Sequence, residues 1–121
     1  MGVKVVDASA LGALLFGEPE GETVAERLRD ATLAAPALLG FEMASVCQKK
    51  MRRHPTDRDE LLAAFDLLPR MTIDIFDVNH AEVVRLAESL GLTVYDASYL
   101  WLSQHLGAEL VTLDRQLDAA R

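Results

Sequence analysis

The sequence predicts one α/β domain in which a parallel four-stranded sheet carries helices on both faces. Short runs rich in β-branched residues alternate with longer helical patterns in the order β-α-α-β-α-α-β-α-α-β-α. Such alternation is typical of parallel sheets with helical crossovers. The chain of 121 residues has the length of one domain, and half of its residues are hydrophobic, which is enough for one sizeable core. No repeat or linker divides it.

Glycine and proline residues divide the first half of the chain into two strands and four helices. Ser9 can cap the first helix, and Pro36 suits the first turn of the third. Thr56 with Asp59 resembles a capping box for the fourth helix. The expected elements are the strand Val3–Val6, the helices Ala10–Phe16 and Glu22–Arg29, the strand Thr32–Ala35, and the helices Ala37–Arg53 and Thr56–Leu68.

The second half supplies two more strands and three more helices. Asn79 is expected to cap a helix with Glu82 three positions on, and Gly91 to end it. Asp96 is placed at the start of the following helix, which Gly107 ends. The expected elements are the strand Thr72–Val78, a helix from Asn79 to Leu90, the almost wholly apolar helix Ala97–Leu106, the strand Glu109–Leu113 and the helix Arg115–Ala120.

Four acidic residues occupy positions that together suggest a site. Asp7 and Asp114 each follow a strand directly, so parallel strands bring both to the same edge of the sheet. Asp96 begins a helix whose apolar composition predicts burial. Glu42 lies where burial of a carboxylate is costly without a partner, in the apolar stripe of Leu38, Leu39, Val46 and Cys47. Taken singly, each acid has a structural explanation in helix capping, turn chemistry or an ion pair. Because their positions converge on one edge of the sheet, the four acids together predict a cluster.

A cluster of four carboxylates repels itself unless cations occupy it. Oxygen-only ligands favour hard ions such as Mg²⁺, with Mn²⁺ as a substitute, over Zn²⁺. Carboxylates that hold such ions are the usual apparatus for hydrolysing phosphodiester bonds. Ser9 and Thr112 each stand two positions from one of these acids, on the same side of an extended backbone. They are expected to bond the acids or a bound water.

The charge of the chain neither requires nor excludes a nucleic-acid substrate. A formal net charge of −7 argues against bulk attraction to RNA, but acids gathered around metal ions inflate that count. Arg115 directly follows Asp114 and is a candidate contact for a scissile phosphate. A second candidate is the group Lys49, Lys50, Arg52 and Arg53, for which the alternative is a solvated helix end.

Four features in chain order resemble the PIN-domain ribonucleases, and more narrowly the VapC-type toxins of toxin–antitoxin pairs: VVDASALGALLFGEP, a Glu in the helix after the second strand, YDASYL and LVTLDRQL. The resemblance covers essentially the whole chain, 1–121, as one PIN domain. It implies a Rossmann-like PIN fold and Mg²⁺-dependent endoribonuclease activity. It also implies neutralisation by a small cognate VapB-type antitoxin, and a homodimer.

Carried over by position, the resemblance implies a catalytic and metal-binding quartet of Asp7, Glu42, Asp96 and Asp114, with Thr112 as the threonine before the last Asp. Asp118 is a candidate outer acid, and solvation is its alternative. Members of the family often continue past the last helix into a short final strand, whereas this sequence ends at Arg121. Either the sheet has one strand fewer than in those members, or a final edge strand is missing from this sequence.

Other functional classes match the sequence less well. A phospho-receiver domain needs a paired acid near the first strand and a late lysine, and no lysine follows Lys50. In a haloacid-dehalogenase-like phosphatase, a second Asp would replace Ser9. A PIN domain that binds RNA or a partner with little catalysis remains the main alternative. No apolar run is long enough for a membrane span, the N-terminus has no signal-peptide pattern and Cys47 is the only cysteine, so we expect a cytoplasmic location.

Overall fold

The computed structural model describes residues 2–121 and contains one sheet of four strands. The strands lie in the order β3-β2-β1-β4, and all neighbouring pairs are parallel. The predicted fold class is confirmed. The strands are β1 (Val3–Val6), β2 (Thr32–Pro36), β3 (Ile73–Phe76) and β4 (Glu109–Val111).

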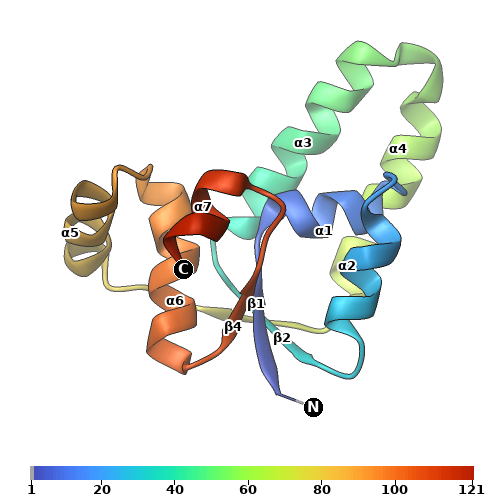
Figure 1. The fold of residues 1–121 in the computed structure, drawn as a ribbon. Helices are drawn as coiled ribbons and strands as arrows, with labels where there is room; N and C mark the ends of the chain where they lie inside the picture. The colour runs from blue at the N-terminus through green and yellow to red at the C-terminus, as the bar shows by residue number, and fades with distance from the viewer. Residues whose placement is uncertain (1) are drawn as a thin grey trace.

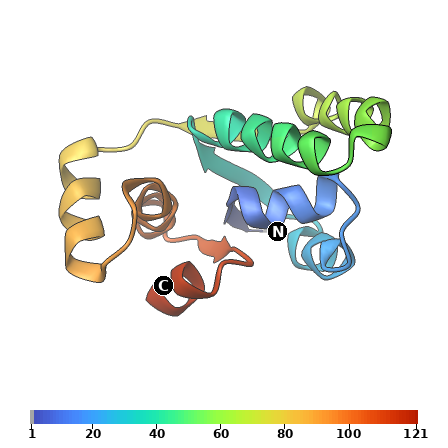
Figure 2. The same ribbon diagram turned by 90° about the horizontal axis from the view of Figure 1, so that it is seen from above.

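Helices cover both faces of this sheet. Helices α1 to α4 lie on one side and α5 and α6 on the other, while α3 and α4 form a hairpin that extends beyond the strands (Figures 1 and 2). Among residues 2–121, no helix combines the length and the apolar character needed to cross a membrane. The helices are α1 (Ala8–Leu15), α2 (Gly21–Leu28), α3 (Leu39–Arg53), α4 (Arg58–Phe65), α5 (His80–Leu90), α6 (Val94–Leu106) and α7 (Arg115–Ala120).

The core lies on both sides of the two central strands. Val5 and Val6 of β1 and Ala34 and Ala35 of β2 are fully buried, as expected for strands of a parallel sheet with two covered faces. Cys47 is buried and free, as its apolar neighbours predict. The largest buried side chains of the helices are those of Leu11, Val24, Met43, Val83, Tyr99, Leu100, Leu102 and Leu117.

Two helices begin earlier than the sequence suggested, because the capping residues were assigned wrongly. Helix α1 begins at Ala8, and its N-cap is Asp7, whose Oδ1 accepts the N–H of Ala10 at 3.0 Å; Ser9 lies inside the helix. Helix α6 begins at Val94, and its N-cap is Thr93, whose hydroxyl accepts the N–H of Asp96 at 3.1 Å. Asp96 therefore belongs to the first turn and is not the cap.

Proline has different roles from those predicted around the α3–α4 hairpin. Pro36 is the last residue of β2, and α3 begins only at Leu39. The capping box at Thr56 is wrong, because Pro55–Asp57 forms a 3-10 turn and α4 starts without a side-chain cap. Helix α4 also ends at Phe65, and a second 3-10 turn, Leu68–Arg70, follows it.

The caps and stops of the later helices agree with prediction. Asn79 Oδ1 accepts the N–H of Glu82 at 3.1 Å and so caps α5. Gly91 and Gly107 end α5 and α6 with φ of 67° and 62°, in the left-handed region that glycine adopts without steric cost. Strand β3 spans Ile73–Phe76 and is shorter at both ends than predicted. Strand β4 ends at Val111 rather than Leu113, so the prediction that Asp114 directly follows a strand is wrong, and a short loop separates the two.

The strand order brings the carboxyl ends of β1 and β4 together. Val6 pairs with Val111, and the N–H of Asp7 donates to the carbonyl of Val111 at 3.2 Å. The chain leaves β1 toward β2 on one side, while β4 lies on the other side of β1. Such a reversal opens a crevice at the carboxyl edge of a parallel sheet, where ligands of these folds bind.

Candidate active site

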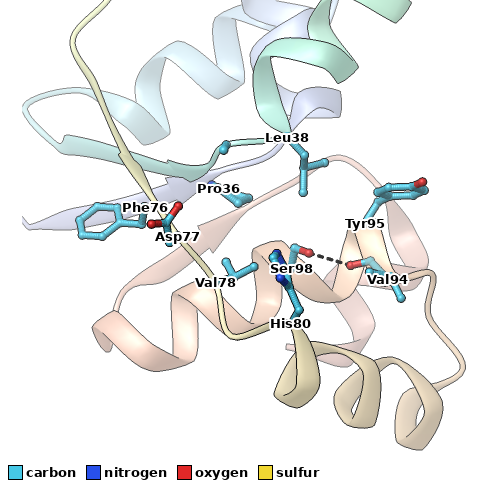
Figure 3. A pocket seen from close by; sticks show the side chains of 10 residues that line it. Pro36, Leu38, Phe76, Asp77, Val78, His80, Val94, Tyr95 and Ser98 are labelled. Atoms are coloured by element: carbon cyan, nitrogen blue, oxygen red, sulfur yellow. Dashed lines mark hydrogen bonds between the residues drawn. The ribbon is translucent and has the colours of Figure 1, made fainter.

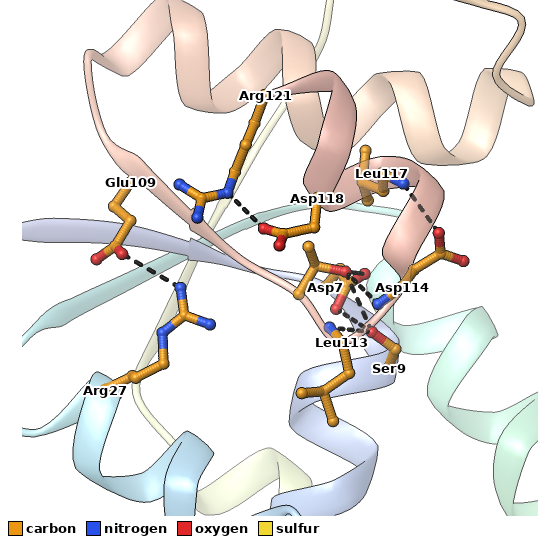
Figure 4. A network of polar contacts seen from close by, with 10 residues as sticks. Asp7, Ser9, Arg27, Glu109, Leu113, Asp114, Leu117, Asp118 and Arg121 are labelled. Carbon is orange, nitrogen blue, oxygen red and sulfur yellow. Dashed lines mark hydrogen bonds and ion pairs between the residues drawn. The ribbon is translucent and has the colours of Figure 1, made fainter.

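Asp7 is the most buried of the four predicted acids, with 4% of its surface exposed. Its Oδ1 accepts hydrogen bonds from Ser9 Oγ at 2.7 Å and from the N–H of Ala10 at 3.0 Å. Its Oδ2 accepts from Thr112 Oγ1 at 2.5 Å. These three bonds fix the carboxylate at the junction of β1, α1 and the loop after β4. Figure 4 shows Asp7 next to Ser9 and Asp114.

Backbone N–H groups orient the two hydroxyls that bond Asp7. The N–H of Leu113 donates to Ser9 Oγ at 2.9 Å, and the N–H of Asp114 donates to Thr112 Oγ1 at 3.0 Å. A hydroxyl that accepts an N–H still has one proton to donate, and here each gives it to Asp7. Ser9 and Thr112 therefore bond the acids as predicted, but both carboxylate bonds go to Asp7.

Asp114 serves the terminal helix as well as the cluster. Its Oδ1 accepts the N–H of Leu117 at 2.9 Å and so caps α7, while its carboxylate is half-buried. Asp118, the candidate outer acid, is exposed and forms an ion pair with Arg121 (Figure 4).

Glu42 is held by a residue that the sequence reasoning missed. Glu42 lies in the first turn of α3, half-buried, and Tyr99 Oη of α6 donates to its Oε1 at 2.6 Å. Tyr99 is only 1% exposed and was assigned to an apolar run. A signal was present, because a buried phenol and a carboxylate in an apolar stripe both need a partner.

Electrostatic repulsion links all four acids. Burial raises the pKa of Asp7, and the charge of Asp114 raises it further, while the bonds from Thr112, Ala10 and Ser9 lower it. Burial also raises the pKa of Glu42 and of Asp96. The charges of Asp96 and Asp7 add to the increase at Glu42, and those of Asp114 and Asp7 add to the increase at Asp96. Each of the four acids thus repels at least two of the others.

No group of three or more His, Cys, Asp or Glu side chains in the described part of the chain is close enough to hold a metal ion. Several carboxylate oxygens instead accept protein hydrogen bonds, including both of Asp7, Oε1 of Glu42 and Oδ1 of Asp114. The donor chemistry still fits a hard cation, because the ligands are all carboxylates and their mutual repulsion is the kind that a cation relieves. Asp7, Glu42, Asp96 and Asp114 have this ligand chemistry, but no three of them lie close enough together in this structure to hold an ion.

The predicted basic contacts separate into two groups. Arg115 is exposed at the first position of α7, directly after Asp114. Lys49, Arg52 and Arg53 are exposed on α3, roughly 10 to 16 Å along the helix axis from Glu42 at the usual rise per residue. Lys50 pairs with Glu18, and its ammonium lies 5.7 Å from the centre of the Phe16 ring, so this lysine already has protein partners.

Residues 4–121 match the family model described as PIN domain. Ribonuclease VapC3 of Pyrobaculum aerophilum is 36% identical to this chain over 118 residues, which cover 93% of this chain and 90% of VapC3. Ribonuclease VapC12 of Mycobacterium tuberculosis is 32% identical over 118 residues, covering 93% and 88%. Exonuclease VapC9 of Pyrobaculum aerophilum is 32% identical over 120 residues, covering 93% and 81%.

Solved structures show the same fold. The crystal structure of PAE2754 from Pyrobaculum aerophilum matches 97% of this chain and 78% of that chain, with a TM-score of 0.78 and 30% identity. The structure of VapC20 from Mycobacterium tuberculosis, described as a sarcin-ricin loop cleaving toxin, matches 97% and 94% with a TM-score of 0.67. Its identity of 17% indicates the fold alone. From the family match and the identity to VapC3 and VapC12, the chain belongs to the PIN-domain family and, within it, to the VapC type.

Proposed function

We propose that this protein is a metal-dependent endoribonuclease, the toxin of a VapC-type toxin–antitoxin pair. The observation that carries the proposal is the cluster of four acids at the carboxyl edge of the sheet, where Asp7, Glu42 and Asp96 all have a raised pKa from burial and from neighbouring carboxylates. Two relatives, VapC3 and VapC12, are named ribonucleases, which supports the same activity.

The proposed metal is Mg²⁺, for which Mn²⁺ can substitute, with Asp7, Glu42, Asp96 and Asp114 as its ligands. When bound, such a cation supplies Lewis-acid chemistry at a phosphodiester. The chain positions the ligands for it. Ser9 and Thr112 hold Asp7, and Tyr99 holds Glu42.

Exposed basic residues are the proposed contacts to the RNA. Arg115 is exposed next to Asp114 and is the proposed contact to the scissile phosphate. Lys49, Arg52 and Arg53 are exposed along α3 and are proposed to contact the RNA backbone further from the cut. Lys50 is less suited to this role than the sequence suggested, because Glu18 already neutralises it.

Linear and circular RNA distinguish internal cleavage from digestion at the ends, a distinction that matters because the relative VapC9 is named an exonuclease. Purified protein would be mixed with both RNAs in Mg²⁺, in Mn²⁺ and in chelator. An Asp7→Asn, Asp96→Asn double variant controls for contaminating nuclease. The proposal predicts that the wild type opens the circular RNA in Mg²⁺ and in Mn²⁺ but not in chelator, and that the double variant does not open it. If the linear RNA is digested and the circular RNA stays intact, the protein is an exonuclease and the endoribonuclease proposal is wrong.

A PIN domain that binds RNA or a partner with little catalysis is the second candidate. The observation that favours it is the absence, within residues 2–121, of three acidic, His or Cys side chains close enough for a metal. Calorimetric titration with Mn²⁺ separates the two functions. Binding that Asp96→Asn weakens supports the nuclease, whereas no binding together with retained RNA affinity supports the binding module.

The remaining parts of the proposal concern assembly. We propose that residues 1–121 form one PIN domain, that a small VapB-type antitoxin neutralises it, and that it forms a homodimer. The VapC type of the relatives supports all three. Sedimentation of the purified chain tests the dimer, and co-purification with the product of a neighbouring small gene tests the antitoxin. The cytoplasmic location stays a prediction.

A further inference from the structure

Two aromatic residues are exposed next to the acids. Phe41 directly precedes Glu42 in α3 and is 85% exposed, and Tyr95 directly precedes Asp96 in α6 and is 63% exposed. Burial of a large aromatic ring is strongly favourable, so the core would normally take both rings. Their exposure beside two site acids suggests that a ligand covers them.

Phe41 and Tyr95 line one cavity. It has a volume of about 380 Å³, and its other walls are Leu38, Glu42 and Ser45. The site acid Glu42 is thus part of the same wall as the two rings. The half-buried side chain of Ser45 adds a hydroxyl that can donate or accept a hydrogen bond. The cavity offers flat apolar surfaces and a few polar groups.

A second pocket borders this cavity. It has a volume of about 230 Å³, shares Leu38 and Tyr95 with the first, and extends to Phe76, the last residue of β3, and to His80, the first residue of α5. Figure 3 shows Tyr95 at one end of this pocket and Phe76 at the other. The two pockets therefore lie on either side of Leu38 and Tyr95, and the second one reaches the edge strand β3 at Phe76.

We propose that Phe41 and Tyr95 form a subsite that binds an unpaired nucleobase of the RNA, next to the phosphate that the four acids cut. This inference rests on the proposed ribonuclease function. Every base has a π-face, so aromatic side chains bind bases of single strands by stacking with little sequence preference. A base inside a duplex has no free face. The subsite therefore selects single strands or loops over paired RNA.

Charge favours a nucleobase over a second copy of this chain as the occupant. The cavity wall contains Glu42, and Asp96 follows Tyr95 directly. A symmetric protein contact on this face would bury these carboxylates further and bring two acidic clusters together, which is costly. A stacked base is neutral, so it covers the rings without adding a carboxylate to the cavity. The base also needs no opposite charge in the cavity.

Photochemical crosslinking tests the contact directly. The probe is a pool of short single-stranded RNAs that carry 5-iodouridine at one of several positions, irradiated in Mg²⁺ with the Asp7→Asn, Asp96→Asn double variant so that the RNA stays intact. Mass spectrometry of the digested protein is expected to find the crosslink at Phe41 or Tyr95. Crosslinks confined to other residues would overturn the subsite.

Steady-state cleavage of single-stranded RNA tests the role of the rings. Phe41→Leu and Tyr95→Leu keep an apolar side chain but remove the flat face, so each is expected to raise KM by about 5- to 150-fold with kcat largely retained, the scale of one lost base stack. Tyr95→Phe keeps the flat ring, so its KM should stay close to that of the wild type. Leu67→Ala is the matched control, since Leu67 is an exposed apolar residue that lines neither cavity.

The outcomes separate this inference from the proposed function. If the wild type cuts RNA and the two leucine variants keep its KM, the subsite is wrong and the ribonuclease stands. If the wild type cuts no RNA in either cation and forms no crosslink, both fail. If sedimentation shows that Phe41→Ala and Tyr95→Ala dissociate a dimer while the leucine variants do not, a second copy covers the rings, and the subsite is wrong.

Discussion

Tyr99 and Glu42 join the two helices that carry half of the acid cluster. Tyr99 lies in α6, three residues after Asp96, and its hydroxyl donates to Glu42 Oε1 of α3 at 2.6 Å. Burial and the charge of Glu42 raise the pKa of the Tyr99 phenol, so it stays protonated as a donor. The bond offsets part of the cost of burying Glu42, and it sets the position of α3 relative to α6 at the site.

The first prediction concerns this bond. Tyr99→Phe keeps the buried ring but removes the donor, so the free energy of unfolding should fall by about 1.5 to 3 kcal/mol, the usual contribution of a hydrogen bond to a charged group. RNA cleavage should fall with it, because Glu42 loses its orientation. Urea unfolding and steady-state kinetics measure the two effects.

A double-mutant cycle controls the Tyr99 prediction. In the presence of Glu42→Gln, the stability cost of Tyr99→Phe should be clearly smaller, since the charged acceptor is gone. An equal cost in both backgrounds would mean that the phenol contributes through packing or another group.

The second prediction concerns the pH dependence of stability at Asp96. Burial and the charges of Asp114 and Asp7 raise the pKa of Asp96 above its ordinary value of 3.8. The folded state then binds more protons than the unfolded state, so the contribution of this group to stability falls as pH rises from 3.8 through the folded pKa. Asp96→Asn should therefore be more stable than the wild type at pH 7 without metal, and this advantage should vanish below about pH 3.8.

Metal adds a second test of the same variant. Mg²⁺ that binds only the folded site stabilises the wild type by mass action, so it should reduce or reverse the advantage of Asp96→Asn at pH 7. Thermal unfolding with and without Mg²⁺ measures this difference. The matched control is Asp59→Asn, at an exposed position of α4. A constant difference between Asp96→Asn and the wild type at every pH and Mg²⁺ concentration would count against the cluster.

The third prediction concerns Thr112. Thr112→Val has nearly the same shape but removes the donor to Asp7 and leaves the N–H of Asp114 without its acceptor. We expect a loss of stability of about 1 to 3 kcal/mol, the cost of an unsatisfied buried polar group. Cleavage should fall more than in Thr112→Ser, which keeps the hydroxyl. Equal activity of the two variants would show that Asp7 is positioned by Ser9 and Ala10 alone.

The fourth prediction concerns the contact between α1 and α2. A Cβ at Gly21 would lie 2.7 Å from the backbone oxygen of Ala13. Because both atoms are fixed by the backbone, no change of side-chain rotamer can relieve this clash. Gly21→Ala should therefore destabilise the protein by about 1 to 3 kcal/mol through overpacking. Gly40→Ala is the control, because nothing lies within 4 Å of a Cβ there and alanine favours helix. It should be neutral or stabilising in the same unfolding assay.

The sequence by itself determined the fold class and the edge at which the acids meet. The alternation of strands and helices predicts the parallel sheet, and a residue directly after a strand lies at the carboxyl edge whatever the details of packing. Asp7 follows this rule directly, whereas β4 ends at Val111 and Asp114 lies three residues beyond it. Asn79, Gly91 and Gly107 were predictable for a related reason, since capping depends on residues a few positions apart.

Only the tertiary structure decided how the acids are held and what surrounds them. The bonds from Tyr99 to Glu42 and from Thr112 to Asp7 join residues 57 and 105 positions apart. The exposed rings of Phe41 and Tyr95 likewise come from different helices. No local periodicity encodes such pairs, because a helical pattern shows which face is apolar but not which neighbour it meets. The partners and cavities of the site follow from packing, and packing is a property of the whole chain.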